Sequence, residues 1–233
     1  MNPTEQLSLA IALDDQATFD NYYAPNGTPQ HMATFLLKDD ARKFAYFSGG
    51  SGTGLSHLLQ AICQTTALSK TTGSVYLPLK DLHSYPASQV LEGLDKAPLV
   101  CIDDLQLVAS CEDWQVPLFN LFNNCRDSGA RLVIAAHQPA DQLDVPLADL
   151  LSRLKSGVSL HLPAFSDADQ RRLLQYRSNR RGLYLSDEVA LFLLHRLPRD
   201  THTLMQALET LDKASLREQR RLTMPFVKGT LDL

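Results

Sequence analysis

The sequence predicts an α/β domain built on a parallel sheet of about five strands, followed by a smaller all-helical domain. Three observations lead to this prediction. Apolar β-type runs alternate with helical patterns before Pro163, a glycine-rich turn joins the first run to a helix, and only helical patterns follow Pro163. Such alternation is typical of a parallel sheet covered on both faces. Right-handed crossovers would place the loops after the strands along one edge of the sheet.

Each expected element follows from a short pattern. Strands are expected at the apolar runs KFAYFS, SVYLPL, APLVCID, RLVIAA and GVSLHL. Helical periodicity predicts helices over 55–68, near 86–95, over 112–127 and near 147–154. Later helices are expected after the N-caps Ser166 and Ser186, with a short closing helix at TMPFVKGTLDL. The expected organisation is a tail over 1–18, an α/β domain over 19–164 and a helical lid domain over 165–233.

Composition narrows the class of protein. The 233 residues are 44% hydrophobic and 21% charged, which is ordinary for a globular chain. A net charge of -4 argues against a protein that mainly grips nucleic acid through its phosphates. The four cysteines have no C-x-x-C spacing, so disulfide and metal sites are weakly indicated and a reducing cytoplasm is expected. No apolar run approaches the ~18 residues of a membrane span.

The segment FSGGSGTGLSH, residues 47–57, suits a phosphate-binding loop. The template is G-x-x-x-x-G-K-[ST], which Gly49, Gly54 and Ser56 match, while Leu55 takes the lysine position. Backbone amides near the start of the next helix would cradle a diphosphate, and those amides belong to Gly52, Thr53, Gly54 and Leu55. A turn that merely needs glycines is the alternative. Without the lysine, diphosphate binding is better supported than triphosphate hydrolysis.

A pair of carboxylates ends the strand PLVCIDDLQ. Asp103 is placed to hold magnesium through water, with Ser56 as the second oxygen ligand, and Asp104 is placed to orient an attacking water. A solvated acidic turn at the end of a strand is the alternative. The position of this pair one βαβ step beyond the glycine loop favours the nucleotide-site interpretation.

Five segments in order resemble a known family. These are TFDNYY (18–23), GGSGTGLSH, CIDDLQ, RLVIAAHQP (131–139) and LLSRLKSG (150–157). Together they resemble the ATPase domain of the bacterial replication initiator DnaA, an AAA+ protein, over roughly residues 18–220. The sequence ends after the expected lid, where an initiator would continue into a helix-turn-helix domain. It is therefore similar to the DnaA-related regulators that inactivate the initiator by stimulating hydrolysis of its bound ATP, and so negatively regulate replication initiation.

The resemblance implies a clamp-binding peptide in the tail. QLSLAI, residues 6–11, is similar to the family's peptide for the DNA polymerase sliding clamp, with contacts from Gln6, Leu7, Leu9 and Ile11. Alternate residues of an extended peptide point to one side, which suits docking into apolar subsites. An amphipathic strand or part of a first helix is the alternative, and Ala10 replaces the family's usual proline. DNA would then be contacted mainly through the clamp.

The resemblance also makes Arg153 an arginine finger that acts on a neighbouring subunit, the DnaA initiator. A guanidinium supplied in trans stabilises charge on the transferred phosphoryl group, an effect of about 10³–10⁵ in rate in comparable systems. The alternative is a helix-terminal arginine that pairs with Asp149 or with the helix dipole.

Further positions are implied near the nucleotide. His137 would occupy the first sensor position, and His202 stands where the family's lid usually has an arginine, with Arg199 one helical turn away as a substitute. Ordinary surface roles are the alternative for both histidines. His57 is a further candidate nucleotide-binding residue. The base would be contacted by Phe19, Tyr22 and Tyr23, for which packing in the core is the alternative.

Since Leu55 and His202 both remove positive charge from the outer phosphates, we expect a bound ADP as a structural switch and little hydrolysis by the chain itself. Magnesium is a further candidate ligand, and a homodimer of the free protein is left open. Two other classes remain as alternatives. One is a self-sufficient P-loop ATPase, and the other is a loader that binds DNA through the basic lid segments REQRRL and QRRLLQYRSNRRGL.

Overall fold

The computed structural model describes residues 13–68, 73–198 and 200–233. These described residues form two compact units: the first includes those up to Gly50 and from Gly54 to Leu162, and the second includes Ser51–Thr53 and those from Pro163 to Leu233. The first unit is an α/β unit and the second is helical. None of the helices in the described parts of the chain is both long and apolar enough to cross a membrane.

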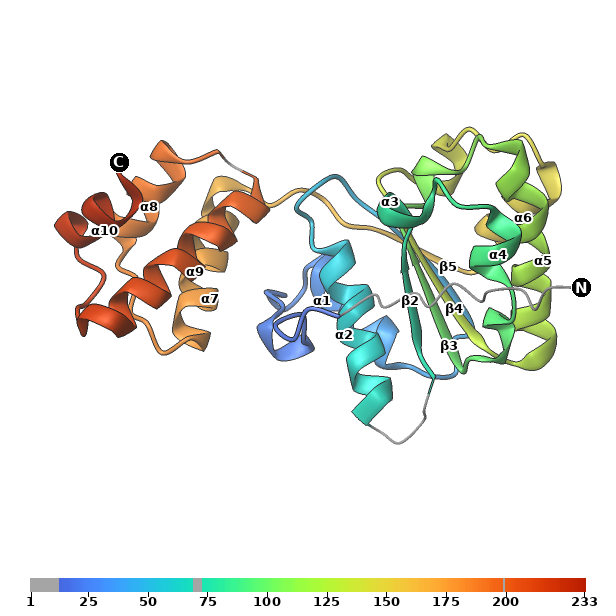
Figure 1. Ribbon diagram of the computed structural model, residues 1–233, viewed down its shortest axis with the longest axis horizontal. Coiled ribbons are helices and arrows are strands. Elements are labelled where there is room, and N and C mark those ends of the chain that lie inside the picture. Colours follow the sequence, from blue (N-terminus) through green and yellow to red (C-terminus); the bar gives the residue numbers. More distant parts are fainter. Residues whose placement is uncertain (1–12, 69–72, 199) are drawn as a thin grey trace, which may run out of the picture. The chain divides into compact units, whose positions relative to one another are not determined.

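A parallel sheet of five strands is the centre of the α/β unit, as the sequence predicted (Figure 1). The strands are β1 (Phe44–Ser48), β2 (Val75–Pro78), β3 (Leu99–Asp103), β4 (Arg131–Ala136) and β5 (Val158–His161). Their order is β2-β3-β4-β1-β5, and every neighbouring pair is parallel. The strand β1 therefore lies between β4 and β5, and β4 separates β1 from β3.

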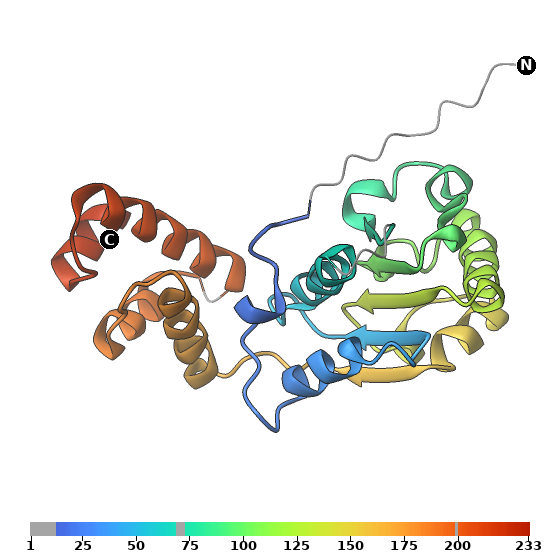
Figure 2. The same ribbon diagram turned by 90° about the horizontal axis from the view of Figure 1, so that it is seen from below.

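Helices cover both faces of the sheet (Figures 1 and 2). The helices of this unit are α1 (Pro29–Lys38), α2 (Leu55–Leu68), α3 (Leu79–Leu82), α4 (Ala87–Leu91), α5 (Glu112–Ser128) and α6 (Ala148–Lys155). Short 3₁₀ turns are η1 (Phe19–Asn21), η2 (Leu94–Lys96), η3 (Leu105–Leu107) and η4 (Ala140–Gln142). The helices α1 and α2 cover one face, and α4, α5 and α6 cover the other.

Two apolar cores follow from this arrangement. Alternate strand residues point to opposite faces of a sheet, so Tyr46 packs with α3 to α6 while its neighbour Phe47 packs with α1 and α2. The same alternation separates Ile102 from Cys101 in β3. Because both faces are covered, the strands β3 and β4 are buried along their whole length, which explains their continuous apolar sequences.

Two helical features differ from the sequence-based expectations. The helix expected near 86–95 is short, because α4 ends at Leu91 and Gly93 takes a left-handed φ of 72° before η2. The helix α1 was not predicted. It begins after Thr28, whose hydroxyl accepts a hydrogen bond from His31 N at 3.2 Å, and Pro29 fits its first turn.

The helical unit contains α7 (Asp167–Arg180), α8 (Asp187–Arg196), α9 (Thr201–Glu218) and α10 (Met224–Leu231). These helices enclose their own apolar core, which includes Leu174, Leu193 and Phe226. The predicted N-caps are confirmed: the Ser166 hydroxyl accepts from Asp169 N, and the Ser186 hydroxyl accepts from Val189 N. The predicted closing helix corresponds to α10.

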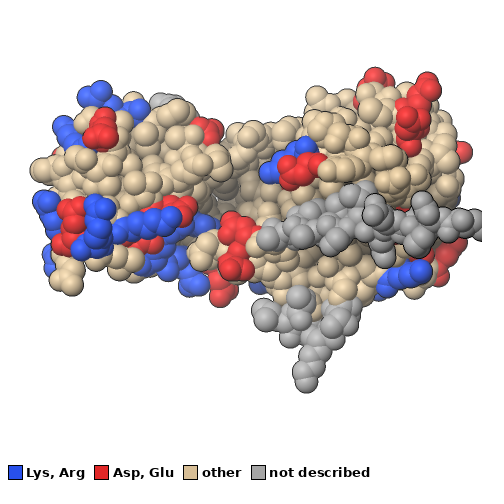
Figure 3. Space-filling view, viewed as in Figure 1, with Lys and Arg blue, Asp and Glu red and all other residues tan. Residues whose placement is uncertain are grey.

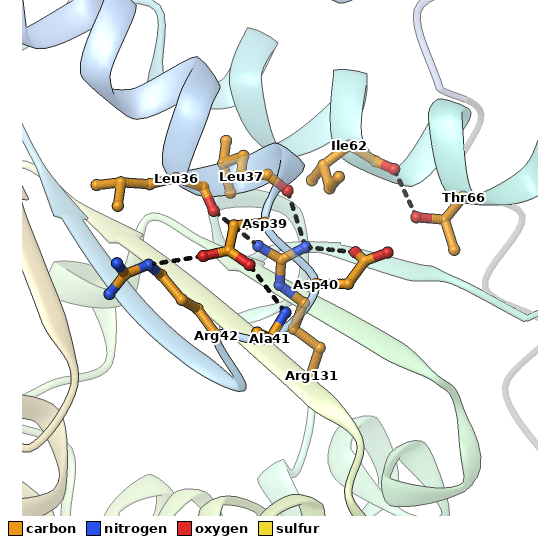
Figure 4. A network of polar contacts seen from close by, with 9 residues as sticks. All are labelled: Leu36, Leu37, Asp39, Asp40, Ala41, Arg42, Ile62, Thr66 and Arg131. Carbon is orange, nitrogen blue, oxygen red and sulfur yellow. Dashed lines mark hydrogen bonds and ion pairs between the residues drawn. The ribbon is translucent and has the colours of Figure 1, made fainter.

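A buried arginine joins the end of α1 to the sheet (Figure 4). The Arg131 side chain, at the start of β4, donates from Nη1 to Leu37 O at 2.8 Å and from Nη2 to Leu36 O at 3.1 Å. These carbonyls belong to the last turn of α1, where a helix has no partners of its own for them. Burial lowers the pKa of Arg131, and Asp40, 3.2 Å from Nη1, opposes that change. Arg131 thus adds side-chain donors to the C-terminal end of α1, where the cap residue Asp39 also donates from N to Leu36 O.

We expect Arg131→Met to lower the free energy of unfolding by about 2–4 kcal/mol, because Leu37 O loses the Arg131 donor and Leu36 O keeps only the 3.4 Å bond from Asp39 N. The matched change Asp40→Ala should cost only about 0.5 kcal/mol, since the Asp40 side chain is 94% exposed. Urea denaturation of the two variants and wild type measures both values. Equal losses would mean that the ion pair with Asp40, and not the capping of α1, provides the stability.

Candidate nucleotide site

The strand order brings three predicted segments to one edge of the sheet. Ser48 at the end of β1 lies opposite Ala136 at the end of β4, and Ile102 of β3 lies opposite Ile134 of β4. Gly49 N donates to Ala136 O at 3.1 Å. The glycine loop, the acidic pair after β3 and His137 after β4 therefore leave neighbouring strands at the same edge.

The glycine loop has the backbone that its sequence requires. Gly52 and Gly54 have φ values of 80° and 89°, in the left-handed region that favours glycine. At Gly54, a Cβ atom would lie 2.6 Å from Tyr22 Cε2, so a side chain there would overlap the tyrosine ring. The helix α2 begins directly afterwards, with Leu58 N bonded to Gly54 O. First-turn N–H groups of an α-helix lack intrahelical acceptors and suit an anion.

Leu55, at the lysine position of the template, is a core residue. It is 6% exposed and belongs to the buried cluster that contains Tyr22 and Leu58. A charged group has therefore been replaced by a side chain that packs inward. The neighbouring Thr53 is also buried, whereas Ser56 is exposed.

The segment 18–23 packs against the start of α2. The His57 ring donates from Nε2 to Thr18 O at 2.7 Å, since a carbonyl oxygen only accepts. Its ring centroid lies 5.3 Å from that of Tyr22, which is buried. Burial of Tyr22 supports the packing alternative for that ring. Phe19, with Lys38 Nζ 5.0 Å from its centroid, and Tyr23 are only half-buried.

Asp103 is 3% exposed and accepts hydrogen bonds at both carboxylate oxygens. Oδ2 accepts from the Tyr76 hydroxyl at 2.8 Å, and Oδ1 accepts from Asp104 N at 3.0 Å. Burial raises the pKa of Asp103, while hydrogen bonds from Ser56 and Tyr76 oppose the rise. The hydroxyl of Ser56 and this carboxylate are oxygen donors of the kind that Mg²⁺ prefers. Their closeness fits the predicted magnesium ligands.

Asp104 and His137 belong to one hydrogen-bonded group through Gln106. Asp104 takes a left-handed conformation, with φ 61°, and its Oδ1 accepts from Gln106 Nε2 at 3.0 Å. Gln106 Oε1 in turn accepts from His137 N at 3.0 Å, and His137 Nε2 lies 3.5 Å from Asp104 Oδ1. The amide of Gln106 thus fixes the predicted water-orienting carboxylate beside the predicted sensor.

Sequence reasoning missed Gln106 and Tyr76. Gln106 lies in the quoted segment CIDDLQ, and an amide can donate and accept at once, which was the available signal. Tyr76 gave a weaker signal, as a hydroxyl-bearing residue in an apolar strand.

Arg153 lies in the last turn of α6 and is half-buried. Its guanidinium carbon is 5.9 Å from the ring centroids of both Phe119 and Phe122 on α5. Within the described parts of the chain, Arg153 forms no ion pair, with Asp149 or with any other carboxylate. The Asp149 part of the structural alternative is thus not seen here, whereas the place of Arg153 in the last turn of α6 suits its other part, the helix dipole. The Ser156 hydroxyl donates to Arg153 O at 2.7 Å and closes the helix.

Some predicted residues lie elsewhere or outside the description. His202, in the first turn of α9 in the helical unit, is exposed, with Nε2 2.8 Å from Gln206 Nε2. Arg199 and the predicted clamp-binding residues lie outside the described residues; the latter are Gln6, Leu7, Leu9 and Ile11. Their roles stay predictions.

A glycine loop between β1 and α2, an acidic pair after β3 and a polar residue after β4 define an AAA+ P-loop protein. The model of the bacterial DnaA ATPase domain matches residues 13–161, and the chain belongs to this family. The model described as Hda, lid domain, matches residues 167–231. The chain thus combines a DnaA-type ATPase domain with an Hda-type lid.

One relative and two solved structures are similar to the chain over most of its length. An uncharacterized protein of Haemophilus influenzae is 41% identical over 238 residues, which cover 98% of this chain and 99% of that protein. Domain III of DnaA from Thermotoga maritima has a TM-score of 0.75 and 21% identity, covering 95% of this chain and 98% of the other. AMPPCP-bound DnaA from Aquifex aeolicus has a TM-score of 0.71 and 18% identity, and the match covers 89% of this chain and 71% of that chain. The two structures support the fold.

The raised pKa of Asp103 predicts a pH-dependent effect of Asp103→Asn. The folded chain binds the proton of the Asp103 carboxyl more tightly than the unfolded chain does. The contribution of this group to the free energy of unfolding is therefore fully present below its unfolded pKa and is lost as pH rises through its folded pKa. The neutral amide should therefore raise the melting temperature at pH 7.5, with a smaller gain at pH 4. Tyr76→Phe, which removes a hydrogen-bond donor to the Asp103 carboxylate, should lower the melting temperature at pH 7.5. A gain that grows toward pH 4 would contradict the assignment.

Burial of Leu55 predicts that restoring the lysine is destabilising. Leu55→Lys should lower the free energy of unfolding of the nucleotide-free protein by about 1–3 kcal/mol, because an ammonium group enters an apolar cluster. Leu55→Met, which keeps the volume and the apolar character, should cost less than about 1.5 kcal/mol. Chemical denaturation without nucleotide measures both. A lysine variant as stable as wild type would show that this side chain does not need an apolar site.

Proposed function

We propose that this protein is a regulatory AAA+ adaptor that holds ADP, is tethered to the DNA-loaded sliding clamp, and stimulates ATP hydrolysis by the DnaA initiator. Hydrolysis would convert the initiator to its ADP form and so restrain initiation of chromosome replication. The proposal assigns a different task to each of three regions: the glycine loop, the N-terminal tail and the end of α6.

The glycine loop would bind the nucleoside diphosphate. Its left-handed glycines and the start of α2 provide an anion-binding backbone. The buried Leu55 stands where the template has the lysine that contacts the outer phosphates, so that positive charge is absent. Nucleotide binding by related folds is illustrated by the AMPPCP-bound DnaA of Aquifex aeolicus. Ser56 and Asp103 would hold Mg²⁺, which would supply countercharge to the diphosphate. We infer that bound ADP serves a structural purpose and that hydrolysis by the chain itself is weak or absent.

The observation that carries the proposal is the state of Arg153. Its guanidinium has no ion-pair partner in the described parts of the chain, yet it is half-buried against two rings at the end of a helix. A pair with Asp149 would have favoured a purely structural role, and the helix dipole at the end of α6 remains the structural alternative. A cation that is ordered but not neutralised is suited to meet phosphate charge on another molecule.

Tethering is assigned to residues 6–11, by their similarity to clamp-binding peptides. An extended segment that places alternate apolar side chains in a groove needs no folded structure of its own before binding. A clamp on DNA would raise the local concentration of the adaptor near initiator bound to the same DNA. Contact with DNA would then be mainly indirect.

Direct DNA binding by the helical unit is less well supported. Its basic side chains lie among acidic ones, as Figure 3 shows on one face. Arg171 lies 3.7 Å from Asp187, and Arg217 lies 3.0 Å from Glu218. Ion pairs of this kind are common on solvated helix faces and leave less charge for phosphates. The self-sufficient ATPase alternative is opposed by the buried Leu55.

The proposal predicts that Arg153→Ala abolishes stimulation of the initiator. Labelled ATP bound to the DnaA initiator is mixed with clamp-loaded DNA, ADP and this protein, and the rate of ADP formation is measured. Wild type should accelerate ADP formation. The rate with Arg153→Ala should be at least about ten-fold lower than the rate with wild type, since arginine fingers raise the rate by about 10³–10⁵ in comparable systems. Arg196→Ala is the matched control, because Arg196 also ends a helix and lies 5.8 Å from a ring centroid, that of Phe192.

Three results would count against the proposal. No acceleration by wild type with an active initiator would refute the adaptor role. Comparable losses in Arg153→Ala and Arg196→Ala would remove the special role of Arg153. Turnover of ATP by the purified protein alone, at rates that match the stimulated reaction, would favour the ATPase alternative.

A further inference from the structure

We propose that Phe119 and Phe122, here called the aromatic platform, position the guanidinium of Arg153 before any partner binds. Phe122 is held in place by an edge-to-face contact with Phe44. This inference rests on the proposed function of Arg153 and adds the device that orders it.

The contact between Arg153 and the platform is made by side chains from two helices. The guanidinium carbon is 5.9 Å from each ring centroid, within the range at which a cation is attracted to an aromatic face. On the same helix, Leu150 and Leu154 are buried in the core beneath α6. The helix is thus held by its apolar side, and the platform lies beside its last turn.

Phe122 is itself fixed in place. It is 7% exposed and meets Phe44 edge to face, with centroids 4.8 Å apart and an interplanar angle of 74°. Phe44 is the first residue of β1, so the support for the platform belongs to the central sheet. Of the two platform rings, Phe119 is half-buried and therefore borders solvent.

Gly157 makes room for this arrangement. A Cβ atom at Gly157 would overlap Phe44 Cδ1 and lie 2.8 Å from Phe44 O. Any larger residue would displace the Phe44 ring or the backbone of β1 at Phe44. The glycine in LLSRLKSG, four residues after Arg153, therefore has a physical role: it allows the packing that supports the platform.

The platform changes how Arg153 can act. A free arginine samples many rotamers and loses that freedom when it enters a binding site. A guanidinium already held over two aromatic rings has lost part of that freedom, and it forms no ion pair in the described parts of the chain that would occupy its charge. The platform should therefore increase the rate of the stimulated reaction without strengthening the docking of the two proteins.

The test compares Phe122→Leu, Phe119→Leu and wild type in the initiator assay, titrating the adaptor to saturation. Leucine keeps much of the volume and removes the ring. The maximal rate should fall about two- to five-fold for each variant, the size expected for one cation–π contact, with an unchanged half-saturating concentration. Phe192→Leu, which removes the ring under Arg196, is the matched control and should behave as wild type. Phe119→Tyr should restore the rate.

A second readout needs no activity. The ¹⁵N relaxation order parameter of the Arg153 Nε–H group should be lower in Phe122→Leu and Phe119→Leu than in wild type, and unchanged in Phe192→Leu. Phe119 is half-buried, so its variant leaves the fold intact if Phe122→Leu unfolds.

The outcomes separate the two proposals. An unchanged maximal rate and an unchanged Arg153 order parameter in both platform variants would refute the positioning role of the two rings and leave the proposed function standing. A raised half-saturating concentration with full maximal rate would also refute the positioning role, because the rings would then be docking contacts. If wild type fails to stimulate the initiator, the proposed function fails. The order parameters then decide the platform by themselves: a loss of Arg153 order upholds it, and no loss overturns it.

Discussion

The position of β4 between β1 and β3 is the constraint on which the rest of the α/β unit depends. In a parallel sheet all carboxyl ends lie on one edge, so the order of strands decides which loops become neighbours. Here the order places the end of β4 between the glycine loop and the acidic pair. His137 can reach Asp104 only because β3 and β4 are adjacent, and Gly49 bonds to Ala136 only because β4 and β1 are adjacent.

Backbone shape and charge are separable properties of such a loop. The turn of the chain is set by glycine conformations and by the start of α2, whereas the charge is set by one side chain. Replacement of that side chain by Leu55 leaves the turn intact because the leucine packs into the core. An AAA+ domain can in this way keep the backbone of a nucleotide site without the lysine charge of the template. In the function that we propose, Arg153 offers a positive charge to another molecule instead.

Much of the fold could be predicted, because short local sequence patterns indicate its strands and helices. Strands, the loop and the caps at Ser166 and Ser186 depend on residues close together in sequence. The helix α1 and Gln106 were missed although their signals are local, whereas other missed features depend on distant partners. An arginine at the start of RLVIAA looks like a solvent-facing residue, and only the fold brings it to the end of α1, more than ninety residues earlier. The contact of Arg153 with Phe122, and the bond from Tyr76 to Asp103, likewise arise from packing between elements.

The strand order also has a consequence for synthesis of the chain. Both partners of β1, the strands β4 and β5, are made after it, and β2 and β3 pair only with later strands or with each other. On the ribosome, β1 therefore emerges without a neighbour and keeps both hydrogen-bonding edges open until residues 131–161 have followed. The glycine loop, which extends from β1, can reach its final form only when nearly the whole α/β unit has been translated. The loop would therefore be able to bind a nucleotide only after most of the α/β unit has been synthesised and folded.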